Sequence, residues 1–522
     1  MSGLLTTFRN VNTRAFVEGI QEGVDNFYIF TGRTQQWDDE ADVPDFIDTF
    51  EGEIDARNSL NGLKKIGADD VAYGIRRIDW SRDRIFDQYD STEDMNGKDF
   101  YVITDQNNVY KCISNNNNGR STSRPVHTTT QTSFEIDGYK WKYMFTVSDE
   151  LLDKFIVPGF LPIGRNETVE NNAIPGTIDN VKIVSAGSGY SANASVELGS
   201  EIPVFIEGDG DQNSSARANV TTSQGVILSI SVTNAGQNYP FAPEQRIPVA
   251  FRQVNPTGVI QNAYGIADTD DEGRISSVQV VVGGSGYVND PVSIVQSNCR
   301  AYAETDGNGV ITNVDVFTGR EGQNFTQARA IPVDADGSGA LLIPLISPFD
   351  GHGSNPELEL FGNFAMINLR LAGDDTFIDI DEFRQVGLIK NPIEFSSAGD
   401  PILVTGDTLD AKFRLTLNQP SDTFELNEDT VALSSGTRAS NLNFFTPDTV
   451  RVSIDRSLGR GFQFIQGESL RGVSSGASAA ITAIQQPDID ILFGEILYIN
   501  NREVITREFD LQVETLTLVI QY

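Results

Sequence analysis

The sequence has very few of the residues that build most metal and nucleophile sites: its 522 residues include two cysteines and two histidines. Cys112 and Cys299 are too few for a disulfide scaffold or a cysteine zinc site, so we expect both to be small buried apolar side chains. His127 and His352 have no second histidine or cysteine nearby, and we expect no Gly-x-Ser-x-Gly nucleophile elbow to support a catalytic role for either. We expect surface or turn positions for both. The sequence therefore predicts a protein that is not an enzyme, with no catalytic residue, cofactor or metal.

Long apolar runs and basic charge are also scarce. The longest apolar run, residues 341–346, is far shorter than a membrane span, and residues 1–5 do not begin a secretory signal. We expect a soluble chain made in the cytoplasm, without membrane insertion. With 38 Lys and Arg against 73 Asp and Glu, the formal net charge is -35. Such a surface repels phosphate backbones, which argues against nucleic acid and favours basic protein surfaces as partners.

What the sequence does contain is glycine and short strand patterns. The chain has 47 glycines, is 39% hydrophobic and 21% charged, and is too long for one core. We predict a mainly β, multidomain protein of β-sandwich or barrel modules, with a few short helices in the N-terminal domain. The predicted segments are residues 1–170, 176–345 and 346–522.

The first segment mixes helical and strand periodicities. Helices are predicted where apolar residues recur with helical spacing, and strands where short apolar runs end at turn residues. The predicted elements are helices over residues 12–22 and 45–65, a strand over residues 27–30, and a hairpin of residues 101–103 and 109–113.

An aromatic strand organises this segment. Its alternate positions are Tyr139, Trp141, Tyr143, Phe145 and Val147. Period-2 alternation predicts a half-buried strand, with Lys140 and Lys142 on a solvent-facing side. The polar residues 114–133 before it show no apolar period, and we expect either a contact loop or a disordered one.

An internal repeat occupies residues 176–345. The phrase Gly-x-Ile-x-x-(Val/Ile)-x-(Val/Ile), followed by a glycine turn and an aromatic, occurs four times. It begins at Gly176, Gly225, Gly273 and Gly309, and it ends at Tyr190, Tyr239, Tyr287 and Phe325. We predict four β-hairpins that share a core, because one hairpin alone is marginally stable. The unequal spacing favours sandwich or barrel modules over a solenoid.

The third segment and the acidic turns complete the prediction. Residues 515–522 alternate apolar and polar side chains, so we expect the chain to end in a strand docked in a sheet. Residues 268–273 resemble the front of a calcium loop, but Gln279 stands at its twelfth position and strands flank it. A hairpin turn is favoured there, and calcium binding stays open. A carboxylate pair at glycosidase distance also stays open.

Several arginines and tryptophans could form protein contacts, since both residue types are enriched at interface hot spots. The interface candidates are Arg33, Trp37, Arg76, Arg77, Asp79, Trp80 and His127. The alternative for residues 76–80 is an Arg–Asp pair within the domain, packed beside Trp80.

The two ends of the chain carry motifs in a defined order. In residues 1–165 they are Phe30-Thr31-Gly32-Arg33 with Trp37, Arg76-Arg77 with Asp79-Trp80, Val109-Tyr110-Lys111-Cys112, and Asp137-Gly138-Tyr139-Lys140-Trp141-Lys142-Tyr143-Met144-Phe145. In residues 350–522 they are Phe383-Arg384-Gln385-Val386 with Asn391-Pro392, and Gly494-Glu495-Ile496-Leu497-Tyr498-Ile499 with Asn501-Arg502. This set resembles the baseplate wedge subunit of T-even-like contractile-tailed bacteriophages (myoviruses). Residues 462–484 also resemble a small β element of other phage structural proteins.

The resemblance implies a structural virion protein of the viral tail baseplate, acting as a homodimer within the wedge. Its implied partners are other baseplate wedge proteins, and it implies no enzymatic activity. Residues 176–345 have no counterpart in the resemblance and are expected to be an insertion. The alternative function is a carbohydrate-binding or polysaccharide-depolymerising tail protein, which β modules with exposed aromatics and abundant carboxylates would suit.

Overall fold

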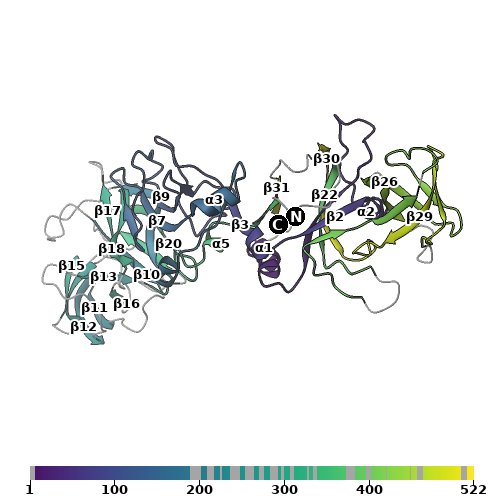
Figure 1. The fold of residues 1–522 in the computed structure, drawn as a ribbon. Helices are drawn as coiled ribbons and strands as arrows, with labels where there is room; N and C mark the ends of the chain where they lie inside the picture. Colours follow the sequence, from purple (N-terminus) through teal and green to yellow (C-terminus); the bar gives the residue numbers. More distant parts are fainter. Residues whose placement is uncertain are drawn as a thin grey trace. The chain divides into compact units, whose positions relative to one another are not determined.

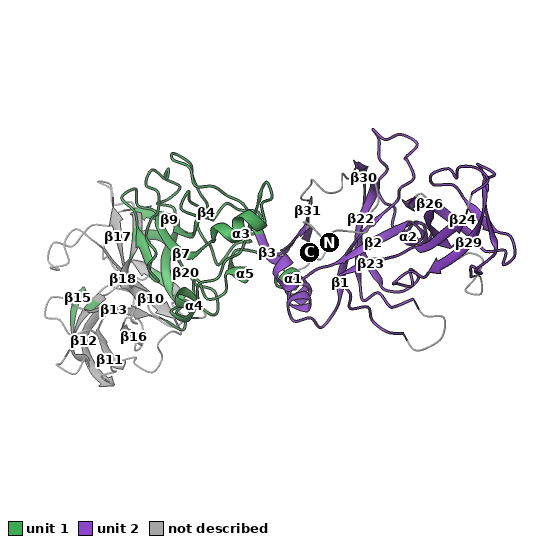
Figure 2. Ribbon diagram, in the orientation of Figure 1, with its two compact units in different colours: residues 1–10, 75–362 green, residues 11–74, 363–522 purple. Residues whose placement is uncertain are grey.

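The computed structural model is that of a mainly β protein (Figure 1). It describes residues 6–188, 202–208, 217–223, 226–234, 247–252, 264–269, 275–282, 292–295, 299–305, 311–321, 323–325, 328–332, 338–371, 382–395, 401–418, 420–446, 448–454, 463–506 and 514–522. The chain forms two compact units (Figure 2). Unit 1 contains residues 1–10 and 75–362, and unit 2 contains residues 11–74 and 363–522. The units therefore divide the chain differently from the segments suggested by sequence pattern.

The helices are few and short. They are α1 (Thr6–Gln21), α2 (Phe50–Asn58), the 3-10 helix η1 (Ala68–Asp70), α3 (Asp149–Lys154), α4 (Glu167–Asn171) and α5 (Pro356–Glu359). The helix predicted over residues 12–22 exists, but it begins earlier. The helix predicted over residues 45–65 is correct only for residues 50–58, because α2 begins at Phe50 after its Thr49 cap and stops at Asn58, where a strand follows. Thr49 caps α2 by accepting a hydrogen bond from the Gly52 amide, which fixes its start.

Strands make up most of both units. Those of unit 1 are β4 (Tyr101–Ile103), β5 (Asn108–Ser114), β6 (Thr132–Phe134), β7 (Lys140–Thr146), β8 (Phe160–Pro162), β9 (Ile178–Ser188), β10 (Ile202–Gly208), β11 (Arg217–Ser223), β12 (Val226–Asn234), β13 (Ile247–Arg252), β14 (Tyr264–Thr269), β15 (Ile275–Val282), β16 (Val292–Val295), β17 (Cys299–Thr305), β18 (Ile311–Glu321), β19 (Ala328–Pro332) and β20 (Ser338–Ile346). Those of unit 2 are β1 (Phe27–Gly32), β2 (Leu60–Lys65), β21 (Phe364–Leu371), β22 (Glu382–Lys390), β23 (Thr408–Asp410), β24 (Phe413–Asn418), β25 (Thr430–Ala432), β26 (Arg438–Thr446), β27 (Thr449–Ile454), β28 (Ser469–Gly472), β29 (Ser478–Gln485), β30 (Glu495–Thr506) and β31 (Glu514–Gln521), with β3 (Val71–Arg76) ending at the boundary.

A five-stranded sheet forms the centre of unit 2, in the order β23-β2-β1-β22-β30. Every residue of β1 is buried, which explains why its apolar run is unbroken. On one face, α1 contributes Phe16, Val17 and Ile20 to a core shared with β21 and β22. On the other face, Tyr28 and Phe30 pack against Leu60 and Leu63 of β2. The C-terminal strand β31 pairs along its length with β21.

The sheet β4-β5-β7-β6 carries the aromatic strand of unit 1. The predicted hairpin is confirmed, since Tyr101, Val102 and Ile103 pair with Lys111, Tyr110 and Val109. Trp141 is fully buried on β7, with the Tyr139 ring stacked on it at a centroid distance of 5.5 Å.

The repeated phrase lies on β9, β12, β15 and β18, and all four strands share one pairing register. The first isoleucine of each phrase pairs with a residue at the same place in the strand pair: Ile178 with Ile346, Ile227 with Thr222, Ile275 with Thr269, and Ile311 with Thr305. In each case the pairing register shifts immediately beside this pair. The hairpins predicted for the second, third and fourth units are confirmed as β11–β12, β14–β15 and β17–β18. The first predicted hairpin is wrong, because β9 pairs with β20, the last strand of the segment. The segment therefore closes on itself.

The two strands at the ends of the largest sheet in this segment also contact each other. In the six-stranded sheet β18-β17-β10-β19-β20-β9, the end strands β18 and β9 lie against each other. Val181 from β9 and Val314 and Val316 from β18 share one core, which agrees with the predicted sandwich or barrel module. Phe325, the closing aromatic of the fourth unit, is buried there. The other three closing aromatics lie outside the described residues.

A closed six-stranded barrel in unit 2 contains a second internal repeat, in the order β24-β27-β26-β25-β28-β29. Residues 424–439 and 464–479 share side chains at matching positions: Phe424 and Phe464, Glu428 and Glu468, the Ser-Ser-Gly turns at 434–436 and 474–476, and Ala439 and Ala479. At the centre, β25 and β28 pair symmetrically about Val431 and Arg471. The barrel is thus two similar halves around a pseudo-twofold axis.

In each half of this barrel, a glutamate side chain binds the Ser-Ser-Gly turn of the other half. We call each of these two contacts a glutamate clasp. The Glu428 carboxylate accepts hydrogen bonds from the Ser474 and Ser475 amides at 3.2 and 3.1 Å. The Glu468 carboxylate accepts from the Ser434 and Ser435 amides at 3.2 and 2.8 Å. Both glutamates are buried, so these bonds satisfy charges that water does not reach.

Candidate functional site

The second face of β7 is the most unusual chemical feature of unit 1. Lys140 and Lys142 are 0% and 4% exposed, so the prediction that they face solvent is wrong. The start of β9 and residues 350–359 cover this face, and neither segment is near β7 in sequence. Lys111 on β5 lies directly opposite Lys142 and is also fully buried. Two like charges opposite each other destabilise a sheet unless other groups compensate them.

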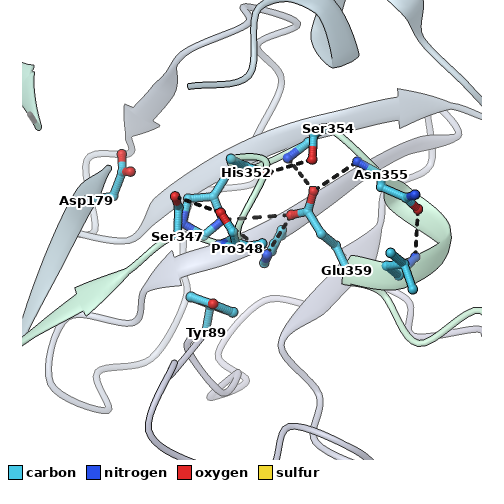
Figure 3. A network of polar contacts seen from close by, with 12 residues as sticks. Tyr89, Asp179, Ser347, Pro348, His352, Ser354, Asn355 and Glu359 are labelled. Carbon is cyan, nitrogen blue, oxygen red and sulfur yellow. Dashed lines mark hydrogen bonds and ion pairs between the residues drawn. The ribbon is translucent and has the colours of Figure 1, made fainter. Parts of the chain in front are cut away.

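Glu359 at the end of α5 compensates Lys111. Its Oε2 accepts a hydrogen bond from the Lys111 ammonium at 2.7 Å, and Lys111 Nζ is also 3.1 Å from His352 Nδ1. The ammonium lies 4.1 Å from the centre of the Tyr89 ring, a cation–π contact. Glu359 Oε1 accepts from the Gly353 amide at 2.7 Å. Figure 3 shows several hydrogen bonds and ion pairs meeting at the Glu359 carboxylate.

Asp179, at the start of β9, compensates Lys140. The Lys140 ammonium donates to the Asp179 carbonyl at 2.9 Å and lies 3.7 Å from its carboxylate. The hydroxyl groups of Thr132 and Thr177 donate to the same carboxylate at 3.1 and 2.6 Å. Both carboxylate oxygens of Asp179 therefore accept a hydrogen bond from a hydroxyl group.

Lys142 lines a small pocket beside this network. Its ammonium donates to the Thr130 carbonyl, and its side chain passes under Gly353, where an added Cβ would lie 3.0 Å from Lys142 Cε. The pocket has a volume of about 40 Å³ and is lined by Thr130, Gln131, Thr132, Lys142, Asn172, Ile174, Thr177, Asp179 and His352. It lies where the 114–133 loop, the end of α4 and the start of β9 meet.

Burial and charge together set the protonation states in the network. Burial lowers the pKa of Lys111 and of Lys142, although Glu359 opposes the change at Lys111. Burial and the Lys111 charge lower the pKa of His352, so its imidazole is neutral near pH 7. Burial alone would raise the pKa of Glu359, but the Lys111 ammonium and the hydrogen bonds outweigh it and hold the pKa at about 2. Glu359 is therefore ionised beside the Lys111 ammonium, and both side chains are buried.

The interface candidates in unit 2 are Arg33 and Trp37, and the structure brings them together. The Arg33 guanidinium lies 3.6 Å from the centre of the Trp37 ring, and Trp37 Nε1 donates to the Arg502 carbonyl at 2.9 Å. Arg33 has a positive φ of 50°. Both side chains are half-buried, which is compatible with a partner contact but does not require one.

The candidates in unit 1 occupy separate positions. Arg77 pairs with Asp79 at 2.9 Å, and both side chains are exposed, so the alternative of a pair within the unit is present. Trp80 Nε1 donates to Ser121 Oγ at 3.1 Å. Arg76 Nη2 lies 3.4 Å from Asp99, and the half-buried His127 ring packs edge-on against Tyr110.

The loop of residues 114–133 has a defined conformation in the structure. Asp137 accepts hydrogen bonds from the Thr122 and Ser123 amides at 2.6 and 2.8 Å. Asn115 holds the loop from its other end, donating to the Phe86 carbonyl at 3.0 Å. Of the two alternatives raised by the sequence, order is favoured, and a contact role stays a prediction.

The remaining sequence predictions concern cysteine, metals and membranes. Cys112 is buried as predicted, and burial raises the pKa of its thiol; the side chain of Cys299 lies outside the described residues. In the part of the chain that the structure describes, no cluster of three or more His, Cys, Asp or Glu side chains could hold a metal ion. The 268–273 turn falls partly outside that part. No helix among the described residues is long and apolar enough to span a membrane.

Sequence reasoning missed the network itself. His352 does lie in a turn, but its ring is buried against Lys111 and Tyr89. Glu359 and Asp179 carried no local signal, because the lysines that they neutralise are more than thirty positions away in the sequence. Comparison of the sequence with protein-family models and with curated proteins finds no match.

Proposed function

We propose that this chain is a structural subunit of a contractile-tail baseplate wedge, acting as a dimer and binding neighbouring wedge proteins. The proposal rests on the motifs at the two ends of the chain that resemble the T-even-like wedge subunit. Residues 176–345 are then an insertion within unit 1. No enzymatic step is part of this role.

The observation that carries the proposal is where these motifs lie. In unit 2, the motifs around Thr31, Val386 and Asn500 are far apart in sequence, yet they lie on the adjacent strands β1, β22 and β30. Thr31 pairs with Val386, and Val386 pairs with Asn500. Short motifs that belong to one inherited structural part are expected to meet in one sheet, and these three do. This arrangement supports the resemblance.

Unit 1 gives a second line of support. The motifs at residues 109–112 and 137–145 lie on the paired strands β5 and β7, and Asp79 of the 76–80 motif forms a bridge with Ile103 of the neighbouring strand β4. The net charge of -35 adds to this. It opposes non-specific self-association and favours docking on basic surfaces of partners.

The test is made in the phage that encodes the chain. A stop codon early in the gene should abolish infectious tails, and supply of the wild-type chain should restore them. Cross-linking mass spectrometry of purified tails should connect the chain to other tail proteins. Infectious tails that lack the chain would contradict the proposal.

Two matched arginine variants sharpen the test. Arg77 is a predicted contact residue, and Arg82 is a nearby exposed arginine outside the candidate set. Exposed ion pairs contribute little to stability, about 0 to 1 kcal/mol, so Arg77→Ala should fold normally. Arg77→Ala is expected to lower tail assembly more than Arg82→Ala. Release of sugar from host polysaccharide by the wild-type chain would instead favour the depolymerase alternative.

A further inference from the structure

The network around β5 and β7 contains more positive than negative charge. Its buried ammonium groups are Lys111, Lys140 and Lys142, and its buried carboxylates are Asp179 and Glu359. The remaining titratable group, His352, is neutral near pH 7 because burial and the Lys111 ammonium lower its pKa. A buried charge is costly unless an opposite charge pairs with it. One positive charge in this cluster therefore lacks a counter-charge among the described residues.

The surplus charge is on Lys142. Lys111 is paired with Glu359 at 2.7 Å, and Lys140 with Asp179 at 3.7 Å. The described residues give the Lys142 ammonium one hydrogen bond, to the Thr130 carbonyl, and no ion pair. An ammonium group has three donors. Two of them remain for a group that this part of the chain does not supply.

A pocket of suitable size lies at Lys142. Its volume of about 40 Å³ exceeds the roughly 10–15 Å³ that a cavity needs to hold one water molecule. A single-atom ion therefore fits in it. A cation would add to the positive surplus, so the charge favours an anion.

His352 supplies a second donor to the pocket. The Lys111 ammonium lies at Nδ1, which must accept, so the ring hydrogen is on Nε2. His352 also lines the pocket. The Asp179 carboxylate, which would repel an anion, is occupied by Lys140, Thr132 and Thr177. The residues that line the pocket thus include a lysine, a histidine with its ring hydrogen on Nε2, and a neutralised carboxylate.

We propose that this pocket binds a small monovalent anion, chloride or a chemical equivalent, between the Lys142 ammonium and the His352 imidazole. The anion supplies the counter-charge that the cluster lacks. It also fastens the 114–133 loop to β7 and β9, because Thr130, Gln131 and Thr132 form one wall of the pocket. The site is independent of the proposed assembly role.

Crystallography with bromide locates the ion. Crystals of the full chain grown with sodium bromide in place of sodium chloride should show an anomalous peak in contact with Lys142 Nζ. Only water at this position in the presence of bromide would overturn the proposal.

Thermal unfolding tests whether binding occurs in solution. The wild-type Tm should be higher in sodium chloride than in sodium gluconate at equal ionic strength, because gluconate is too large for the pocket. The difference should saturate with chloride concentration, as binding to the folded state alone requires. Equal Tm values in the two salts would overturn the proposal, even with a bromide peak in the crystal.

Two variants separate the site from general salt effects. Lys142→Met removes the charge but keeps the length of the side chain, and it should abolish the difference between chloride and gluconate. Lys98→Met, at a half-buried surface lysine paired with Glu93 and outside the pocket, should retain the difference. A chloride effect that persists in Lys142→Met would overturn the assignment. If Lys142→Met does not fold, the bromide position and the saturation curve of the wild type decide.

Discussion

At Glu359, a single carboxylate neutralises a lysine that water does not reach. Lys111 is 0% exposed and donates to Glu359 Oε2 at 2.7 Å. Removing one partner of a buried pair leaves the other charge uncompensated, which costs about 3 to 5 kcal/mol. We expect Glu359→Gln to lower the free energy of unfolding by this amount at pH 7, as measured by urea denaturation. Glu357→Gln, at a less buried neighbour, should have little effect and serves as the control.

The pH dependence of the same pair follows from its pKa. The pKa of Glu359 is about 2 in the folded protein, against 4.5 ordinarily. A carboxylate with a lowered pKa stabilises the fold fully above its ordinary pKa, and this contribution is lost as pH falls through the folded value. The advantage of the wild type over Glu359→Gln should thus be constant above about pH 5 and shrink between about pH 4.5 and 2. An advantage that is unchanged at pH 2 to 3 would contradict this pairing.

Burial of Lys140 and Lys142 is the main point at which residue-level prediction failed. The alternation of β7 was predicted correctly, and so was the apolar face that contains Trp141. Alternation shows which residues share a face, but it does not show what covers that face. The cover comes from Asp179 and residues 350–359, which approach β7 only after the chain has folded. No local pattern encodes such a contact.

At the scale of elements, the two glutamate clasps of the barrel allow a symmetric test. Glu428 and Glu468 each accept amide hydrogen bonds from the opposite Ser-Ser turn, and the clasps share no partner. Hydrogen bonds to charged groups contribute about 1.5 to 3 kcal/mol. We expect Glu428→Gln and Glu468→Gln each to destabilise the protein by about that amount.

The double variant measures whether the halves of the barrel act independently. Distant sites without shared partners have additive effects on stability to within about 0.5 kcal/mol. The double substitution should therefore cost the sum of the two single ones in chemical denaturation. Glu425→Gln, at an exposed position, is the control. Strongly unequal single effects would contradict the pseudo-twofold equivalence.

Element prediction succeeded where the pattern was local and failed where pairing was distant. The β4–β5 hairpin and strand β1 were predicted because their apolar runs end at turn residues. Residues 60–65 were predicted as helix because Leu60 and Leu63 have helical spacing, but pairing with β1 and β23 makes them a strand. The partner of β9 was missed for a related reason. β20 is at the other end of the repeat segment, and no local signal joins the two.

At the scale of the whole molecule, unit 2 is assembled from two distant stretches whose ends meet. Apart from residues 1–10, unit 1 is inserted into the chain of unit 2 between Gly74 and Asn363. Gly74 of β3 pairs directly with Phe364 of β21. Antiparallel strands that end at a pair can be joined by a tight turn such as Asn-Gly. Residues 6–74 and 364–522 can thus be linked through such a turn without altering β3 or β21.

We expect this excised chain to fold on its own, because unit 2 has its own cores on both faces of β1 and within the barrel. It should unfold in one cooperative transition that remains when the rest of the chain is absent. Calorimetry and circular dichroism measure this, with Leu388→Asp in the same chain as the negative control, since Leu388 is fully buried. A soluble but non-cooperative product would show that unit 2 requires unit 1 to fold. A cooperative product would mean that unit 1, with its repeat segment, is an insertion between two paired strands of an independently stable unit.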